Sequence, residues 1–249
     1  MLNSVVSSFA DLHTALGRYT TSTMFRGVKC TEFTLTPSIG RMTFVTGRSA
    51  HVEEQNMLSK FRQRAIPHLE FSPADDWDWL TLAQHHGLPT RILDWTWNPL
   101  VAAYFAVEDE DFAGDGVLYA IRKFPRIDIE TCASPFDAAH IGKYVPRHVT
   151  RRLIVQAGLF TIHPEPNVPL PNEALETIVI RSSARRELKR SLYWYGIHRA
   201  SLFPDLDGLA AHIRWLREGY GDEVAEPPYS NTRTSPEGAE PPLNSTSAR

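Results

Sequence analysis

The sequence contains little cysteine and no long apolar run. Cys30 and Cys132 are the two cysteines among 249 residues, too few for a disulfide framework and not spaced as metal ligands. No apolar run approaches the roughly 20 residues needed to cross a bilayer. The N-terminus has no basic stretch followed by an apolar core, so we expect no signal peptide. These absences favour a cytoplasmic protein without a membrane partner.

A strong excess of charge of either sign is also missing. The formal net charge is -3, which gives no overall attraction to nucleic acid or to anionic membranes. The sequence has no GxxxxGK[ST] phosphate loop, no GxGxxG after a strand, no GxSxG elbow and no HExxH pair. His85, His86, Asp94 and His163 could in principle hold a metal, but adjacent histidines seldom ligate one ion together, and we predict no metal site.

The most informative stretch is 80–107, which combines a polar cluster, a turn and a wholly apolar run. A polar group beside a core must be paired, or it costs about 1–3 kcal/mol. The cluster consists of His85, His86, Arg91, Asp94 and Thr96. It is either a network that satisfies itself or a functional site. As a network, Arg91 would pair with Asp94 and close the turn, and the histidines would cap a helix end.

Periodicity and capping signals predict an α+β fold, with a small mixed β-sheet core and several surrounding helices. We expect a single domain over residues 1–222 and a disordered tail rich in Pro, Ser and Glu over 223–249.

The expected helices are 4–17, 52–65, 72–86 with Ser72 as N-cap and Gly87 beyond its end, 100–107 with Asn98 as N-cap, 183–196, and one after Pro204 whose Leu206, Leu209, Ile213 and Leu216 face the core. The expected strands are 20–30, 90–96, 116–122, 126–130, 159–163 and 176–182.

Two features could contact an anion. Arg26 lies within an apolar, β-prone stretch and precedes Gly27, and a guanidinium beside a glycine suits close approach of a phosphate. The alternative is a structural ion pair. The second feature is the stretch 135–152, which is the most basic in the chain and could contact phosphate, although a solvated helix face explains it as well.

Several motifs together resemble the FRG domain family. Phe25-Arg26-Gly27, followed by Thr36-Pro37-Ser38-Ile39 and Arg41, is similar to the start of that domain. The run from Ala83 to Thr96, AQHHGLPTRILDWT, with Asn98-Pro99-Leu100 and Tyr104-Phe105-Ala106, resembles its central signature. Gln156, Gly158 and Phe160-Thr161 resemble a later Gln-x-Gly-x-Phe element. The resemblance spans residues 20 to 215.

The FRG arrangement in turn distantly resembles the NAD-binding core of ADP-ribosyltransferases. This resemblance implies an ADP-ribosyltransferase-like fold, with NAD as the substrate that supplies ADP-ribose. Arg26 would match the early basic residue, 90–96 the strand rich in Ser and Thr, and 102–106 the apolar helix. The late strand of those enzymes carries a Glu or Gln. No Glu stands there in this sequence, and Gln156 is the nearest candidate.

The resemblance implies a role for each candidate residue. Arg26 and Gly27 would hold phosphate, Thr90 or Thr96 would bond a ribose, and Trp95 or Tyr104 would stack on nicotinamide. Arg91 belongs to the same cofactor-binding set. His85 or His86 would act as the base for the acceptor, with Asp94 and Gln156 completing the catalytic set.

The expected activity is cleavage of the nicotinamide–ribose bond and transfer of ADP-ribose to an unknown acceptor, either protein or nucleic acid. Such an enzyme would suit a toxin or a phage-defence effector. Two alternatives stay open. One is a nucleic-acid-binding or -processing module that uses the basic stretch 143–152, and the other is a non-catalytic ligand-binding or interaction domain.

Overall fold

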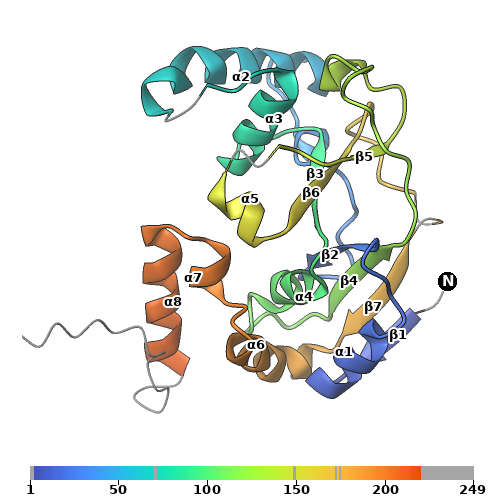
Figure 1. The fold of residues 1–249 in the computed structure, drawn as a ribbon, viewed down its shortest axis with the longest axis vertical. Coiled ribbons are helices and arrows are strands. Elements are labelled where there is room, and N and C mark those ends of the chain that lie inside the picture. Colours follow the sequence, from blue (N-terminus) through green and yellow to red (C-terminus); the bar gives the residue numbers. More distant parts are fainter. Residues whose placement is uncertain (1–2, 70–71, 148–149, 172, 174, 220–249) are drawn as a thin grey trace, which may run out of the picture. The chain divides into compact units, whose positions relative to one another are not determined.

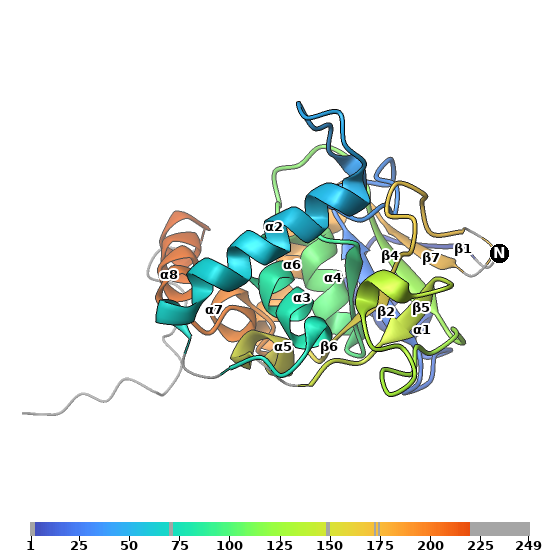
Figure 2. The same cartoon turned by 90° about the horizontal axis from the view of Figure 1, so that it is seen from above.

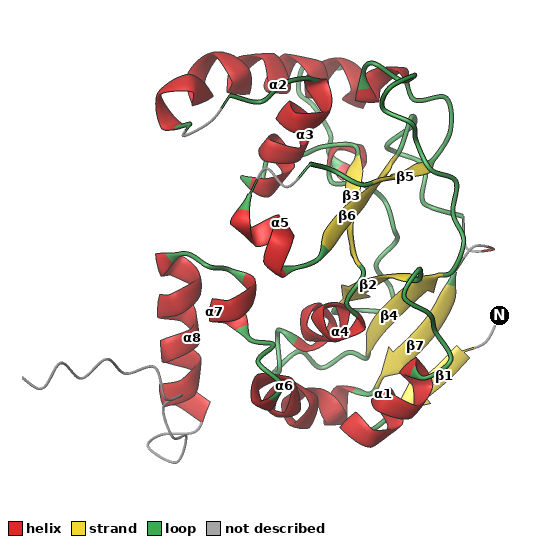
Figure 3. Cartoon of the chain, viewed as in Figure 1, coloured by secondary structure: helices red, strands yellow, loops and turns green. Residues whose placement is uncertain are grey.

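The computed structural model describes residues 3–69, 72–147, 150–171, 173 and 175–219, and it has an α+β fold (Figures 1 and 3). Seven strands form one mixed sheet in the order β1-β7-β4-β2-β3-β6-β5. The strands are β1 (Asn3–Val6), β2 (Met24–Val28), β3 (Ile92–Thr96), β4 (Gly116–Ile121), β5 (Gly142–Tyr144), β6 (Gly158–Ile162) and β7 (Glu176–Ile180). The helices are α1 (Phe9–Leu16), α2 (Ala50–Ala65), α3 (Asp76–His85), α4 (Pro99–Val107), α5 (Arg151–Val155), α6 (Arg185–Trp194), α7 (Arg199–Leu202) and α8 (Leu206–Gly219).

The chain divides into two compact units, Met1–His212 and Ile213–Arg249. The first unit contains the whole sheet and α1 to α7. In the second, the described residues are 213–219, which are helical. The domain end expected at residue 222 and the disordered tail expected over 223–249 lie outside the described residues.

The sheet consists of two well-paired halves that meet at one residue pair. Five residue pairs join β2 to β4, and five join β3 to β6. Between β2 and β3, by contrast, Phe25 and Thr96 form the single pair. Beyond that pair the two strands diverge, so their facing backbone groups must find other partners. The divergence opens the sheet beside Arg26 and Gly27.

The core of the fold consists of three buried clusters. One packs α4 and α6 against β2, β4 and β7, with Phe25, Tyr104 and Leu188 among its members. A second packs α2 and α3 against β3, β5 and β6, including Trp77 and Tyr144, and α2 and α3 lie side by side in Figure 2. The third lies on the opposite face of the sheet. The first two share one face, and the opening between β2 and β3 separates them.

Local capping signals predicted the centre of the chain correctly. Asn98 caps α4 through its side-chain oxygen, which accepts from the Leu100 amide at 2.9 Å, and Pro99 follows at N1. Gly87 has a φ of 82° just beyond α3, where a left-handed residue ends a helix. Strands at 92–96, 116–121, 158–162 and 176–180 also agree with the predicted runs.

Other predicted elements are wrong. The expected helix over 4–17 is divided, because 3–6 form β1, which pairs in parallel with β7, and Ser8 caps a shorter α1. Asp75 rather than Ser72 caps α3. The expected strand 126–130 makes one isolated bridge, between Arg126 and Lys143. Leu206, Leu209 and Ile213, expected in the core, are exposed.

Candidate functional site

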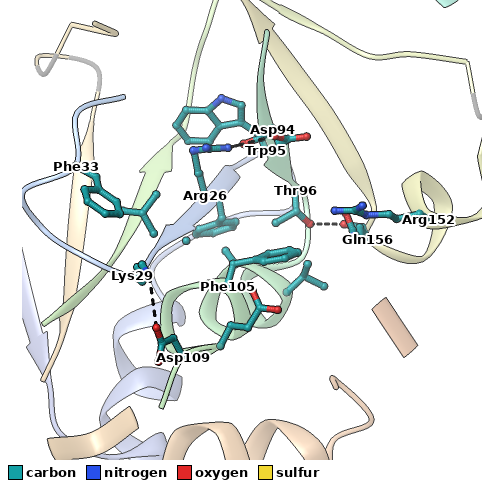
Figure 4. A pocket seen from close by; sticks show the side chains of 16 residues that line it. Arg26, Lys29, Phe33, Asp94, Trp95, Thr96, Phe105, Asp109, Arg152 and Gln156 are labelled. Atoms are coloured by element: carbon teal, nitrogen blue, oxygen red, sulfur yellow. Dashed lines mark hydrogen bonds and ion pairs between the residues drawn. The ribbon is translucent and has the colours of Figure 1, made fainter. Parts of the chain in front are cut away.

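A cavity of about 540 Å³ lies where β2 and β3 diverge (Figure 4). This volume is within the roughly 300–1,000 Å³ typical of small-molecule sites. Its walls come from β2, β3, α4 and α5, so the two halves of the sheet both contribute. Its charged residues are Arg26, Lys29, Asp94, Glu108, Asp109 and Arg152, and its aromatic residues are Phe25, Phe33, Trp95 and Phe105.

Arg26 bridges the opening in the sheet. Its Nη1 donates to the Asp94 carbonyl oxygen at 2.5 Å and lies 3.7 Å from Asp94 Oδ2. This hydrogen bond gives the Asp94 carbonyl oxygen a partner where β2 no longer pairs with β3. The contact with the Asp94 carboxylate confirms in part the expectation of a structural ion pair. Nε is buried and has no hydrogen-bond partner among the described residues. Burial lowers the pKa of the guanidinium, and Asp94 opposes that shift. The Arg26 side chain remains 21% exposed and lines the cavity.

Gly27 lines the cavity, but its main constraint is helix packing. A Cβ on Gly27 would lie 1.7 Å from the Ala102 carbonyl oxygen and 2.8 Å from the Ala106 nitrogen. The backbone of α4 therefore rests directly on β2 at this position. The structure thus gives the glycine a packing role, and the predicted role of admitting an anion stays a prediction.

Asp94 is the exposed residue of β3, between the buried residues of the same strand, and joins a short polar relay. Gln84 donates from Nε2 to Asp94 Oδ2 at 2.9 Å, and Thr90 donates from Oγ1 to Gln84 Oε1 at 2.5 Å. The Asp94 side chain is still 60% exposed, so it remains accessible to a ligand. Thr90 is buried and lies outside the cavity, and the structure gives it the role of orienting Gln84.

Arg91 forms a buried pair with Glu54 of α2, and not with Asp94 as expected. Its Nε donates to Glu54 Oε2 at 2.8 Å and its backbone N–H to Oε1 at 2.6 Å. Both side chains are almost completely buried, at 0% and 1% exposure. Nη2 lies 2.9 Å from His51 Nδ1. Arg91 lies outside the cavity with its donors engaged, so its position does not fit the predicted cofactor-binding role.

Thr96 and Gln156 connect β3 to the turn before β6. Thr96 Oγ1 donates to the Gln156 carbonyl oxygen at 2.6 Å and accepts from the Asn98 amide at 2.9 Å. Gln156 Nε2 donates to the Leu202 carbonyl oxygen at 2.9 Å, and its Oε1 accepts no hydrogen bond from the described residues. Both residues line the cavity, and Figure 4 shows them side by side.

His85 and His86 lie at the end of α3, outside the main cavity. Their rings meet edge to face, and His86 is exposed. His85 lines an adjoining cavity of about 250 Å³, which shares Asp94, Arg152 and Gln156 with the larger one. Its Nδ1 lies 3.3 Å from Thr150 Oγ1. Burial lowers the pKa of His85 to about 4, and the positive charges of Arg152 and His86 contribute to the shift by repelling a proton on the ring.

The two aromatic candidates differ in position. Trp95 lines the cavity, and its Nε1 donates to Thr161 Oγ1 at 3.1 Å. Tyr104 does not line the cavity, because it points into the cluster beneath α4, where burial and the nearby Glu108 carboxylate raise the pKa of its hydroxyl. Its predicted stacking on nicotinamide therefore does not fit its position. Phe105, its neighbour along α4, reaches the cavity instead.

Behind Trp95, Thr161 Oγ1 also lies 3.1 Å from Nε2 of His163, which is fully buried. Burial lowers the pKa of His163 to about 4, so the unfolded chain takes up a proton near pH 6.5 that the folded protein does not. The stabilisation is complete above pH 6.5 and is lost as the pH falls towards 4. We expect His163→Gln to flatten the fall in unfolding free energy between pH 6.5 and 5 by about 1.4 kcal/mol per pH unit, measured by urea melts. An unchanged slope would contradict this.

Sequence reasoning missed several residues of the cavity wall. Lys29, Phe33, Phe105, Glu108 and Arg152 were not among the candidates. Lys29 lies 3.4 Å from Asp109, and Glu108 pairs with Arg199. Arg152 was noted only as part of the basic stretch. Arg26 and Val28 are two residues apart on β2 and therefore lie on the same face of the strand, which could have pointed to this part of the cavity wall. The sequence around Phe33 and Glu108 gives no sign that either residue lines a cavity.

The basic stretch is largely committed to other contacts. Arg147 pairs with Asp75 at 2.7 Å and with Asp78 at 3.3 Å, Lys143 lies over the Trp97 ring, and Arg152 faces the cavity. His148 lies outside the described residues. The described residues contain no group of three or more His, Cys, Asp or Glu side chains arranged to hold a metal. None of the helices in the described ranges has the length and apolarity required to cross a membrane.

Comparison with protein families gives one result. Residues 21–114 match the model of the FRG domain. The match includes β2, α2, α3, β3 and α4, and therefore most of the cavity wall, whereas Arg152 and Gln156 lie beyond its end. No curated protein and no solved structure matches the chain.

Proposed function

This chain contains an FRG domain, and we propose that it is an NAD-consuming ADP-ribosyltransferase, acting as a toxin or a defence effector. The proposal includes the finer fold assignment, in which the divergent sheet resembles the NAD-binding core of ADP-ribosyltransferases. In this enzyme the nicotinamide–ribose bond of NAD breaks, and ADP-ribose passes to an acceptor. The observation that carries the proposal is the composition of the cavity between β2 and β3.

The cavity combines the groups that a dinucleotide requires. A guanidinium suits the pyrophosphate, because it forms paired, charge-assisted hydrogen bonds, and Arg26 brings one to the cavity wall. Aromatic rings suit the planar bases, and Phe33, Trp95 and Phe105 line the walls. The cavity volume of about 540 Å³ accommodates a ligand of this size.

The polar groups that line the cavity beside β3 also suit the chemistry of this reaction. Loss of nicotinamide passes through an oxocarbenium-like ribose, as in glycoside cleavage, and an anion nearby lowers its energy. Asp94 offers a carboxylate that is held by Gln84 yet exposed to solvent. Gln156 Oε1 is available to a ribose hydroxyl. In our proposal Asp94 therefore stabilises the cation, and Thr96 acts by positioning Gln156.

The proposal is tested by incubating the full chain with NAD and measuring released nicotinamide. We expect Arg26→Ala to lower kcat/KM for NAD by about a hundredfold, as for loss of a preorganised donor to developing or fixed negative charge. The kcat/KM of Arg26→Lys should lie between those of the wild type and Arg26→Ala, because lysine keeps the positive charge but not the paired donors of the guanidinium.

The control is Arg64→Ala, which removes an exposed arginine from α2 and should leave turnover unchanged. Circular dichroism would verify that all variants fold. Wild-type protein that neither binds nor cleaves NAD would contradict the proposed function. Equal turnover by Arg26→Ala would contradict the assignment of this cavity.

A further inference from the structure

Arg152 stands at the boundary between the two adjoining cavities. It lines both of them, together with Asp94 and Gln156. Its guanidinium stacks on the Phe203 ring, with Cζ 4.2 Å from the centroid. In the described part of the chain the guanidinium makes neither a hydrogen bond nor an ion pair. Burial lowers its pKa, and the Asp94, Asp205 and Glu108 carboxylates oppose that shift without bonding to it, so its donors are open to an anionic ligand.

The smaller cavity is lined mainly by polar groups and has room for one side chain. Its volume is about 250 Å³, and Thr150, His85 and Phe160 line it together with Asp94. The contact between His85 Nδ1 and Thr150 Oγ1 fixes the imidazole ring. Asp94 and Gln156, which the proposed function places beside the reacting ribose, separate this space from the larger cavity. A group bound here would therefore approach the ribose from the side away from the NAD cavity.

We propose that the smaller cavity is the acceptor subsite, and that it takes a carboxylate side chain held by Arg152. This inference rests on the proposed function. A carboxylate oxygen forms a bond to C1′ of the nicotinamide ribose, the C1′–N bond breaks, and its electron pair leaves with neutral nicotinamide. The product is an ester of ADP-ribose, and no proton is transferred.

The state of His85 agrees with an acceptor that is already ionised. Its pKa of about 4 makes the ring neutral at pH 7 and too weak a base to activate a hydroxyl or an ammonium group. A carboxylate needs no such activation.

The experiment uses the full chain, NAD labelled in its adenylate phosphate, and three probes. The first probe is N-acetyl-glutamic acid α-amide, the second is its glutamine counterpart, and the third is a 5′-phosphorylated dinucleotide. Released nicotinamide and labelled probe are measured in the same reaction. We expect label on the glutamate probe alone, in a bond that neutral hydroxylamine cleaves.

The variant Arg152→Gln should lower the ratio of labelled probe to released nicotinamide by about tenfold or more, the loss expected for a charge-assisted hydrogen bond. Arg151→Gln is the matched control, because Arg151 is exposed and lines neither cavity, and it should keep the wild-type ratio.

Labelling of the glutamine probe or of the dinucleotide at an equal or higher rate would overturn the carboxylate acceptor, and so would equal effects of the two arginine variants. Nicotinamide release without any labelled probe would overturn the acceptor subsite and leave the proposed function standing. Absence of nicotinamide release would contradict the proposed function, and the acceptor subsite with it.

Discussion

Replacing Glu54 with alanine is expected to lower the free energy of unfolding by about 3–5 kcal/mol. The Glu54 carboxylate accepts from the Arg91 backbone and from its guanidinium, and solvent reaches neither side chain. Without Glu54 the Arg91 charge stays buried, with the Pro164 carbonyl oxygen and the His51 ring as its remaining polar partners. An uncompensated buried charge is costly, whatever the net contribution of the intact pair.

The measurement is urea unfolding at pH 7, with Gln55→Ala as the control. Gln55 is the next residue of α2 and is exposed, so its replacement tests helix propensity without the charge and should change stability by less than about 0.5 kcal/mol. The double variant Glu54→Ala, Arg91→Met should recover part of the loss, because it removes the orphaned charge. A double variant that loses as much as the sum of the singles would contradict this explanation.

The Glu54–Arg91 pair also shows which part of the candidate site could not be predicted from the sequence. His85, Arg91 and Asp94 are neighbours along the chain, and their polarity next to an apolar run predicted either a network or a site. The structure contains a buried network and, beside it, a cavity. Asp94 lines the cavity, whereas Arg91 turns to α2, 37 residues earlier in the chain. Alternation along β3 places adjacent residues on opposite faces, but the identity of a distant partner carries no local signal.

The fold was predictable where local physical chemistry decides it. Asn98-Pro99 begins α4 and Gly87 ends α3 because caps depend on a few adjacent residues. β1 was mistaken for helix because Val5 fits both periodicities, and only its pairing with Val179 of β7 decides between them. The divergence of β2 from β3 is of the same kind. It occurs where α4 packs on β2, and no pattern in β2 alone could reveal that packing.

Replacing Gly27 with alanine is therefore expected to affect both stability and function. The added Cβ would meet backbone atoms of Ala102 and Ala106, and backbone cannot rotate away as a side chain can. Overpacking typically costs about 1–3 kcal/mol, and a clash with helix backbone should reach at least the upper end of that range. Because Ala102 and Phe105 also line the cavity, displacement of α4 would change the proposed NAD site as well.

The control for this change is Gly17→Ala at the end of α1. There the φ is -59° and a Cβ would meet its nearest neighbour at 3.5 Å, so alanine should be neutral or slightly stabilising. Urea unfolding and nicotinamide release would be measured on both variants. A stable Gly27→Ala variant with wild-type turnover would mean that α4 does not rest on β2 as described. A stable variant without turnover would restore the first interpretation of Gly27, that the glycine makes room for an anion.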